Sequence, residues 1–268
     1  MKTFFVLASL TLFLAACGQS DEPAAVAAPE VAEVAAPEAS ETPMQSSAAS
    51  GELLVDYIWN NTADDMTEAQ MAGIIDGWNA RIDAGGYNML GANVLMPQFE
   101  TDDYDLIWVV MWPSSEAREA GWADWNANQV DDWTAELAGA MSYEPENVYT
   151  FKPTDGHDGM EDIAVGGTFH PRFDFCSFNE GQDEASLAAF RAEYDAWLVE
   201  GESNNYGYYL MEPQFDLADA DFVWLDLFGD EAALEAGTAS WTGSALEASW
   251  EAMATCENYA FLATAIRR

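Results

Sequence analysis

The chain of 268 residues is 50% apolar and 13% aromatic, which is ample for a sizeable hydrophobic core. It has 48 acidic residues against 8 basic ones, giving a formal net charge of −40. Such a charge argues against nucleic acid or an anionic lipid surface as a partner, and we interpret it as a solubilising coat rather than as a specific cation-binding surface.

An export signal is predicted at the N-terminus. A charged start precedes an apolar run, residues 4–16, which is too short to span a bilayer. The run ends Leu14-Ala15-Ala16-Cys17, which resembles the lipobox of bacterial lipoproteins. The resemblance implies cleavage before Cys17 and attachment of fatty acids such as palmitate to it, so that a lipid bilayer becomes a partner of the chain. The alternative is an ordinary secretory signal with a chance cysteine.

The segment after the anchor is predicted to be a disordered tether. Residues 17–50 consist mainly of Ala, Pro, Glu and Ser, with too few large apolar side chains to offset the entropy of ordering. Gly18 directly after the cysteine resembles lipoproteins that are sorted to the outer membrane, facing the periplasm or the cell surface. Removing Lys2 with the signal leaves 7 basic residues against 48 acidic ones, a mature net charge of −41.

The remaining residues contain an internal repeat with a constant spacing of 116. Pro97-Gln98-Phe99 returns as Pro213-Gln214-Phe215, and 14 of the 38 positions 88–125 are identical to their counterparts in 204–241. Unrelated segments would share roughly 2 or 3 residues over this length, so the sequence indicates a duplication. We therefore expect two similar units, at 51–152 and 168–268, joined by a connector at 153–167.

Each unit shows the element order β-α-β-β-α-β. Strands are predicted from runs of β-branched and aromatic residues, and helices from apolar stripes that follow a capping residue such as Thr67 or Ser114. In the first unit the strands are Leu53–Asn60, Leu90–Met96, Tyr104–Trp112 and Asn147–Phe151. In the second they are Thr168–Phe178, Tyr206–Met211, Asp221–Phe228 and Asn258–Ala263.

This order is that of a ferredoxin-like unit, and two such units in tandem resemble the dimeric α/β-barrel superfamily. The resemblance implies an α+β fold in which two ferredoxin-like β-α-β-β-α-β repeats form an intramolecular pseudo-twofold α/β barrel with its helices outside. The unbroken apolar run Leu106–Trp112 supports a barrel, because a sheet with one face in water would alternate apolar and polar residues.

Two cysteines follow the anchor, Cys176 and Cys256. In an exported protein such a pair suggests a disulfide. In a ferredoxin-like unit the first and last strands pair antiparallel, which makes a bridge between these positions reasonable. Two reduced, buried thiols are the alternative.

The period of two along a strand sorts residues by face. On the third strands the larger side chains share one face, which we assign to the barrel interior, and the smaller aliphatic side chains share the face under the helices. Asp226 is then expected to point inward, towards His170, Arg172 and Asp174 of the neighbouring strand. The sequence comparison places Val110 and Leu54 at the first-half positions that correspond to Asp226 and Arg172.

A candidate site follows from these faces. Asp226 or His170 would be a catalytic base, and the ligand-binding residues would be Arg172, Asp174, Trp108, Trp112, Trp224 and Phe228. A few polar groups that converge in an apolar cavity are typical of a small-molecule site. The structural alternative is that Arg172 only neutralises Asp226 or Asp174.

Several kinds of chemistry lack a signal in this sequence. It contains no zinc-type, phosphate-loop, nucleophile-elbow or dinucleotide motif, and its two histidines make a metal site improbable, so we expect no metal and no cofactor. A haem held by His170 has little support. Three functions stay open: a lipoprotein that binds a small apolar or aromatic molecule or docks an envelope partner, a cofactor-independent monooxygenase- or isomerase-like enzyme of the barrel type, and a purely structural envelope protein. The sequence does not fix the oligomeric state, and a monomer is compatible with it.

Overall fold

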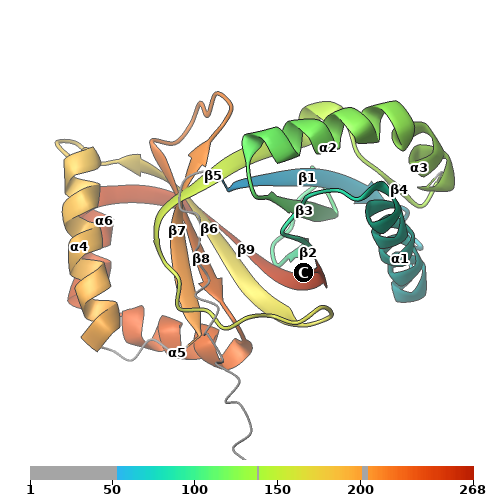
Figure 1. The fold of residues 1–268 in the computed structure, drawn as a ribbon. Coiled ribbons are helices and arrows are strands. Elements are labelled where there is room, and N and C mark those ends of the chain that lie inside the picture. The colour runs from blue at the N-terminus through green and yellow to red at the C-terminus, as the bar shows by residue number, and fades with distance from the viewer. Residues whose placement is uncertain (1–52, 138, 201–204) are drawn as a thin grey trace, which may run out of the picture. The chain divides into compact units, whose positions relative to one another are not determined.

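A computed structural model describes residues 53–137, 139–200 and 205–268 (Figure 1). The predicted signal, the predicted lipidation residue Cys17 and the predicted tether fall outside these residues. Within them, no helix is both long and apolar enough to span a membrane.

The described residues contain eight antiparallel strands that close into one barrel. The order around it is β1-β3-β2-β9-β6-β8-β7-β5, and β5 pairs with β1 to complete the circle. A short strand, β4 (Met141–Ser142), adds to β1 outside the barrel. The barrel strands are β1 (Leu54–Thr62), β2 (Gly91–Pro97), β3 (Leu106–Trp112), β5 (Val148–His157), β6 (Thr168–Phe178), β7 (Tyr206–Pro213), β8 (Phe222–Phe228) and β9 (Ala254–Arg267).

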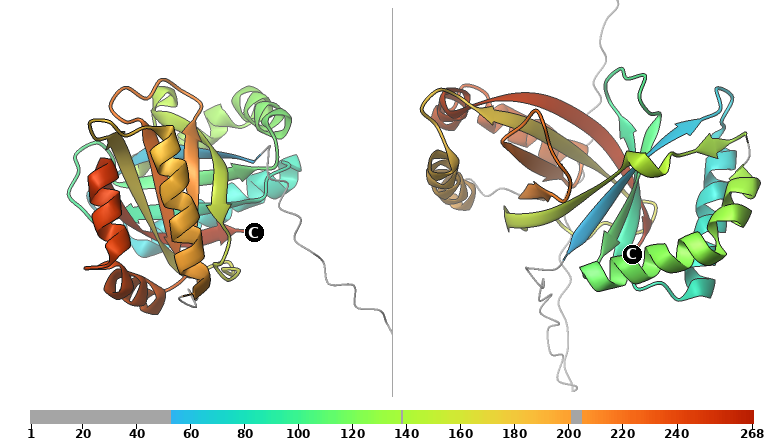
Figure 2. Two further views of the ribbon diagram at one scale, coloured as in Figure 1. Left: turned by 90° about the vertical axis from the view of Figure 1, so that its left-hand side faces the viewer. Right: turned by 90° about the horizontal axis from the view of Figure 1, so that it is seen from above.

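Six α-helices lie outside the barrel in the described part of the chain. Three lie beside the first-half strands and three beside the second-half strands (Figures 1 and 2). Thr67 caps the first helix in a capping box with Gln70, and Ser114 caps the second. The helices are α1 (Glu68–Gly85), α2 (Ser115–Asn128), α3 (Val130–Leu137), α4 (Glu184–Glu200), α5 (Glu231–Trp241) and α6 (Ala245–Met253), with a 3-10 turn η1 (Pro145–Asn147) before β5.

Two long strands connect the halves. β9 pairs with β6 of its own half and with β2 of the first half, while β5 pairs with β1 and with β7. Both extend beyond the ranges predicted from sequence, and β5 includes residues 153–157, which the sequence analysis assigns to the connector. Proline and glycine are unusual in a strand, but a register shift near Asp155, whose φ is 37°, accommodates them.

The barrel interior is a packed core, and the predicted face assignment is wrong. Large rings enter it from the first and last strands of each half, including Tyr57, Phe151, Phe173 and Phe261. The third strands contribute their smaller side chains there, such as Ile107, Val109, Val223 and Leu225. An eight-stranded barrel has room for little more, so the bulky face of β3 and β8 turns outward and packs under the helices.

A disulfide joins the first and last strands of the second half. Cys176 on β6 lies directly opposite Cys256 on β9, and the structure bonds the two sulfurs. The residues are 80 positions apart in sequence.

Candidate functional site

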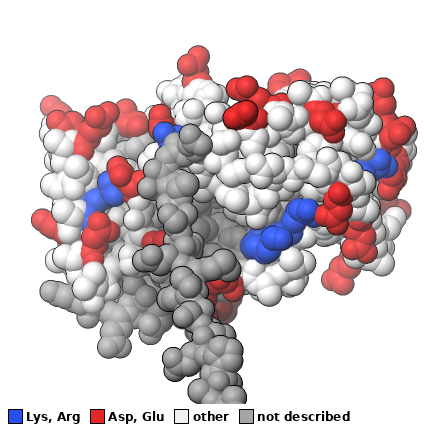
Figure 3. All heavy atoms as spheres, viewed as in Figure 1, with Lys and Arg blue, Asp and Glu red and all other residues white. Residues whose placement is uncertain are grey.

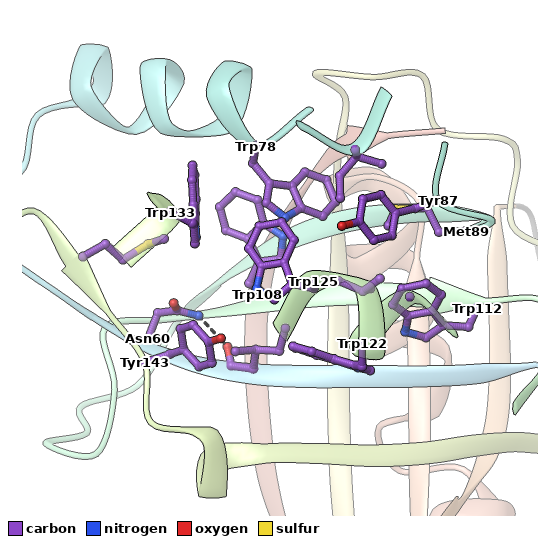
Figure 4. Close-up of a pocket in the computed structure, with 15 residues that line it drawn as sticks. Asn60, Trp78, Tyr87, Met89, Trp108, Trp112, Trp122, Trp125, Trp133 and Tyr143 are labelled. Atoms are coloured by element: carbon purple, nitrogen blue, oxygen red, sulfur yellow. Dashed lines mark hydrogen bonds between the residues drawn. The ribbon is translucent and has the colours of Figure 1, made fainter. Parts of the chain in front are cut away.

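The two helix-covered spaces outside the barrel differ in size. In the first half, the space under α1, α2 and α3 is about 60 Å³ and is surrounded by tryptophans (Figure 4). In the second half, the space under α4, α5 and α6 is about 1180 Å³. Ligand pockets typically measure about 300–1,000 Å³, so only the second space has the size of a ligand site. We call it the second-half cavity.

In the first half, a buried carboxylate is fully satisfied by the protein's own side chains. Asp56 on β1 is 0% exposed, and its oxygens accept hydrogen bonds from four donors at 2.7–2.9 Å. The donors are the indole nitrogens of Trp112 and Trp122, Nε of Arg118 on α2, and the Thr150 hydroxyl. This carboxylate is therefore neutralised and has no position left for a ligand.

Asp226 on β8 is a buried carboxylate of the second half, with 2% exposure. Oδ2 accepts a hydrogen bond from Arg172, and Oδ1 accepts from the Tyr206 hydroxyl at 2.5 Å and from the Trp224 indole at 2.8 Å. The carboxylate also raises the pKa of Arg172. Asp226 lines the cavity, but its oxygens are occupied, which does not suit a free general base.

Asp174 on β6 is different. It lines the same cavity and is 4% exposed, and its Oδ1 accepts a hydrogen bond from Asn258 and lies 3.6 Å from Nε of Arg172. Burial raises its pKa to about 6, against the lowering effect of Arg172. Burial thus brings the pKa of Asp174 closer to neutral pH than its ordinary value of 3.8.

Strand registers correct the correspondence between the halves. Val110 and Asp226 are 116 residues apart; Val110 pairs with Asp56 on β1, and Asp226 pairs with Arg172 on β6. Arg172 therefore corresponds to Asp56 and not to Leu54. The sequence comparison did not show this correspondence, because the ungapped alignment covered only residues 88–125 and therefore did not include the first strand of either half.

Two side chains that line the larger space are smaller than their counterparts in the first half. At positions 116 apart, Trp112 is replaced by Phe228 and Trp122 by Thr238. In both halves a glycine of the helix packs against a ring of the third strand, because a Cβ on Gly121 would lie 2.5 Å from Trp112 and one on Gly237 would lie 2.7 Å from Phe228. The missing indole of Trp122 leaves open space beneath α5.

The structure separates the predicted site residues into two groups. Arg172, Asp174, Asp226, Trp224 and Phe228 come together at the second-half cavity. The other tryptophans, Trp108 and Trp112, line the small first-half space instead.

His170 is not brought into the cavity lining. It lies at the start of β6, where its Nε2 is 3.5 Å from Glu231 of α5. Proximity to a surface carboxylate on the helix does not connect it to Asp226.

Several lining residues were not predicted as site residues, among them Tyr194, Trp197, Tyr206, Trp241 and Trp250. Those on helices follow the apolar stripe that sequence reasoning assigned to the core, and they do pack against one another: the Tyr194 ring is 5.5 Å from that of Trp224. Their periodicity alone gives no signal of a cavity. Only the comparison of Trp122 with Thr238 between the halves could have indicated it.

The lining does not fit a haem. Among the described lining residues there is no histidine or methionine, and Cys256 is held in the disulfide. Tyrosine can ligate haem iron as a phenolate, but burial and the neighbouring Asp226 carboxylate raise the pKa of Tyr206 well above its usual value. The residues present thus offer no suitable axial ligand.

Comparisons with known proteins identify the fold. The chain is similar to a protein from Fusobacterium nucleatum provisionally named a monooxygenase, with a TM-score of 0.54 and 10% identity over 80% of this chain and 93% of that one. The similarity to a protein provisionally named a chlorite dismutase has a TM-score of 0.50 and 10% identity, over 80% of this chain and 94% of that one. The similarity to a mutant chlorite dismutase from Candidatus Nitrospira defluvii has a TM-score of 0.50 and 7% identity, over 80% of this chain and 92% of that one.

These similarities place the chain among dimeric α/β-barrel folds: an α+β structure with an eight-stranded antiparallel barrel and six helices in its described part. At such low identity they show the fold alone. No protein-family model matches the sequence, and no curated protein matches it significantly.

Proposed function

We propose that this protein is a lipid-anchored, extracytoplasmic binding protein that holds a small, largely apolar or aromatic molecule in the second-half cavity. The single observation that carries the proposal is the difference between the halves: about 1180 Å³ in one and about 60 Å³ in the other. A purely structural barrel would have no reason to leave one of two similar spaces open, because unfilled apolar volume costs stability.

The proposal includes a duplicated architecture, with a first repeat at 51–152, a connector at 153–167 and a second repeat at 168–268. Matching hydrogen bonds support it. The backbone N–H of Gln98 donates to Ala260 and that of Gln214 donates to Thr150, while Asp105 accepts from the N–H of Thr62 and Asp221 from that of Phe178. Each pair is the same contact with the halves exchanged, as a pseudo-twofold axis requires.

The anchor and the location are also part of the proposal. They rest on the lipobox-like Leu14-Ala15-Ala16-Cys17 and on Gly18 after it. The 17–50 tether would hold the barrel away from an outer membrane, on the periplasmic side or at the cell surface.

An enzyme is the second candidate, and one observation favours it. The pKa of Asp174, raised to about 6 by burial, suits a general base, and this carboxylate replaces Asp226 and His170 in that role. Such an enzyme would be cofactor-independent and of monooxygenase or isomerase type. It would convert the bound molecule, whereas a binding protein would return it unchanged, as mass spectrometry of the ligand after incubation can show.

The binding function can be tested by refilling the cavity with the side chain that the first half uses. Wild-type protein is titrated with the neutral fluorescent probe N-phenyl-1-naphthylamine, and we expect saturable binding of one molecule per chain. Thr238→Trp restores the residue found at Trp122 and should abolish most of this binding.

Ala239→Trp is the matched control, because Ala239 is exposed on the same helix and is not a lining residue. Equal binding by all three proteins, or no saturable binding by the wild type, would overturn the proposal and leave a structural envelope role.

A further inference from the structure

We propose that the molecule held in the second-half cavity is an organic cation, with an ammonium group attached to an aromatic or apolar part. This inference rests on the proposed binding function and adds the chemical class of the ligand. It follows from the charges, the hydrogen bonds and the rings that line the cavity.

The charges of the lining do not balance. One basic residue, Arg172, is accompanied by five carboxylates: Asp174, Asp226, Asp230, Glu247 and Glu251. Two of these, Asp174 and Asp226, are buried. In the first half, one buried carboxylate, Asp56, faces one arginine, Arg118. The second half thus carries one buried carboxylate more than its arginine can neutralise.

Asp174 is the carboxylate in excess. The guanidinium hydrogen bond of Arg172 goes to Asp226, and only Nε comes within 3.6 Å of Asp174. Asp174 Oδ1 accepts from Asn258, and among the described residues no donor is bonded to Oδ2. An ammonium group in the cavity would donate a charge-assisted hydrogen bond to this oxygen and balance the charge of the carboxylate.

The rings of the cavity suit the same ligand. Seven aromatic side chains line it, and a cation over an aromatic face is attracted by the ring quadrupole. The chain already uses this contact there, because the Arg172 guanidinium carbon lies 6.0 Å from the centroid of Phe228. The seven are Tyr194, Trp197, Tyr206, Trp224, Phe228, Trp241 and Trp250.

The first half shows which groups fill such a space. The indoles of Trp112 and Trp122 occupy it and direct their N–H groups to Asp56. A ring that carries a nitrogen donor towards a strand carboxylate is therefore the arrangement that the fold accommodates. In the second half, Arg172 takes the position of Asp56, so the carboxylate that the ligand's ammonium group would meet is Asp174, two residues further along β6.

A matched set of small probes tests the charge preference. Wild-type protein at pH 7.5 is titrated calorimetrically with 2-phenylethylamine, 2-phenylethanol and phenylacetate, which share a phenyl group and differ in charge. We expect the amine to bind roughly 10- to 100-fold more tightly than the alcohol, the range of one charged hydrogen bond, and phenylacetate to bind most weakly. Asp174→Asn should reduce the amine to the affinity of the alcohol.

Glu119→Gln removes one charge from the exposed surface of α2 and should leave the preference unchanged. An alcohol or phenylacetate that binds as tightly as the amine, or an Asp174→Asn variant that retains the preference, would overturn the cation inference. If the cation inference fails but N-phenyl-1-naphthylamine still binds the wild type and not Thr238→Trp, the proposed binding function remains supported. If that probe also fails to bind, both proposals fall.

Discussion

Asp226 and Asp174 lie on adjacent strands of one cavity floor, yet their surroundings give them opposite effects on stability. Asp226 accepts three hydrogen bonds and pairs with Arg172, whereas Asp174 is desolvated with fewer partners. Removing charge from the first should therefore destabilise the fold, and removing it from the second should stabilise it.

Asp226→Asn should lower the free energy of unfolding by roughly 3–5 kcal/mol, because Arg172 would remain half-buried with a weakened partner. Urea denaturation at pH 7.5 measures this value. Glu235→Gln on the exposed side of α5 is the control for loss of charge alone. A variant as stable as the wild type would mean that the ion pair contributes nothing.

Asp174→Asn should raise the free energy of unfolding at pH 7.5 by roughly 1–3 kcal/mol, since about 1.4 kcal/mol accompanies each unit of pKa difference. The folded pKa of Asp174, about 6, lies above its ordinary value of 3.8, so the folded state binds the proton more tightly. Its stabilising contribution is fully present below pH 3.8 and is lost as pH rises through about 6.

The gain in the variant should therefore shrink as pH is lowered from 7.5 and vanish near pH 4. Thermal melts of both proteins across this range measure it. A difference that stays constant with pH would contradict the raised pKa.

At the scale of residues, the sequence could identify the charged groups but not their positions in space. The grouping of Arg172, Asp174 and Asp226 on one side of adjacent strands follows from the period of two. The side itself does not, because bulky and small apolar faces are both compatible with burial. The sequence could not identify Tyr206 and Trp241 as cavity-lining residues for a related reason. Aromatic residues that pack in a core and those that line a cavity recur along the chain with the same periodicity.

At the scale of elements, the strands and helix caps could be predicted because their signals are local. Thr168–Phe178 coincides with β6, and Thr67 and Ser114 cap the predicted helices. The extensions of β5 and β9 could not be predicted, because they result from pairing with strands of the other half. Tertiary pairing outweighs the weak strand propensity of Pro153 and Gly156.

The disulfide between β6 and β9 provides a test at this scale. Replacing both Cys176 and Cys256 with serine should lower the free energy of unfolding by roughly 2–4 kcal/mol, because the bond closes a long loop in the unfolded chain. Chemical denaturation with and without a reductant checks this. Reductant should shift the midpoint of the wild type to that of the double variant and leave the variant unaffected. An unshifted wild type would mean that the bond does not form in solution.

At the scale of the whole molecule, the barrel could be expected from element order and duplication together, since an unbroken apolar strand needs cover on both faces. The acidic residues spread over the visible surface around few basic ones, as a solubilising coat should (Figure 3). The unequal spaces under the two sets of helices could not be foreseen, because a cavity depends on how side chains from different elements meet.

The proposed anchor is also tested on the whole molecule. Cys17→Ala in the full chain should release the protein from the membrane fraction into the soluble fraction, because no acyl chain can then be attached. Cell fractionation with immunoblotting measures this. A Cys17→Ala protein that stays in the membrane fraction would contradict lipid anchoring at this residue.

The central claim is that one small molecule binds in the second half and not in the first. The chain has 11 tryptophans, and each indole N–H gives its own signal in a nitrogen-15 correlation spectrum. On addition of N-phenyl-1-naphthylamine, the account predicts that the signals of Trp197, Trp224, Trp241 and Trp250 shift while those of Trp108, Trp122, Trp125 and Trp133 do not. Shifts in the first-half group, or no shifts at all, would contradict it.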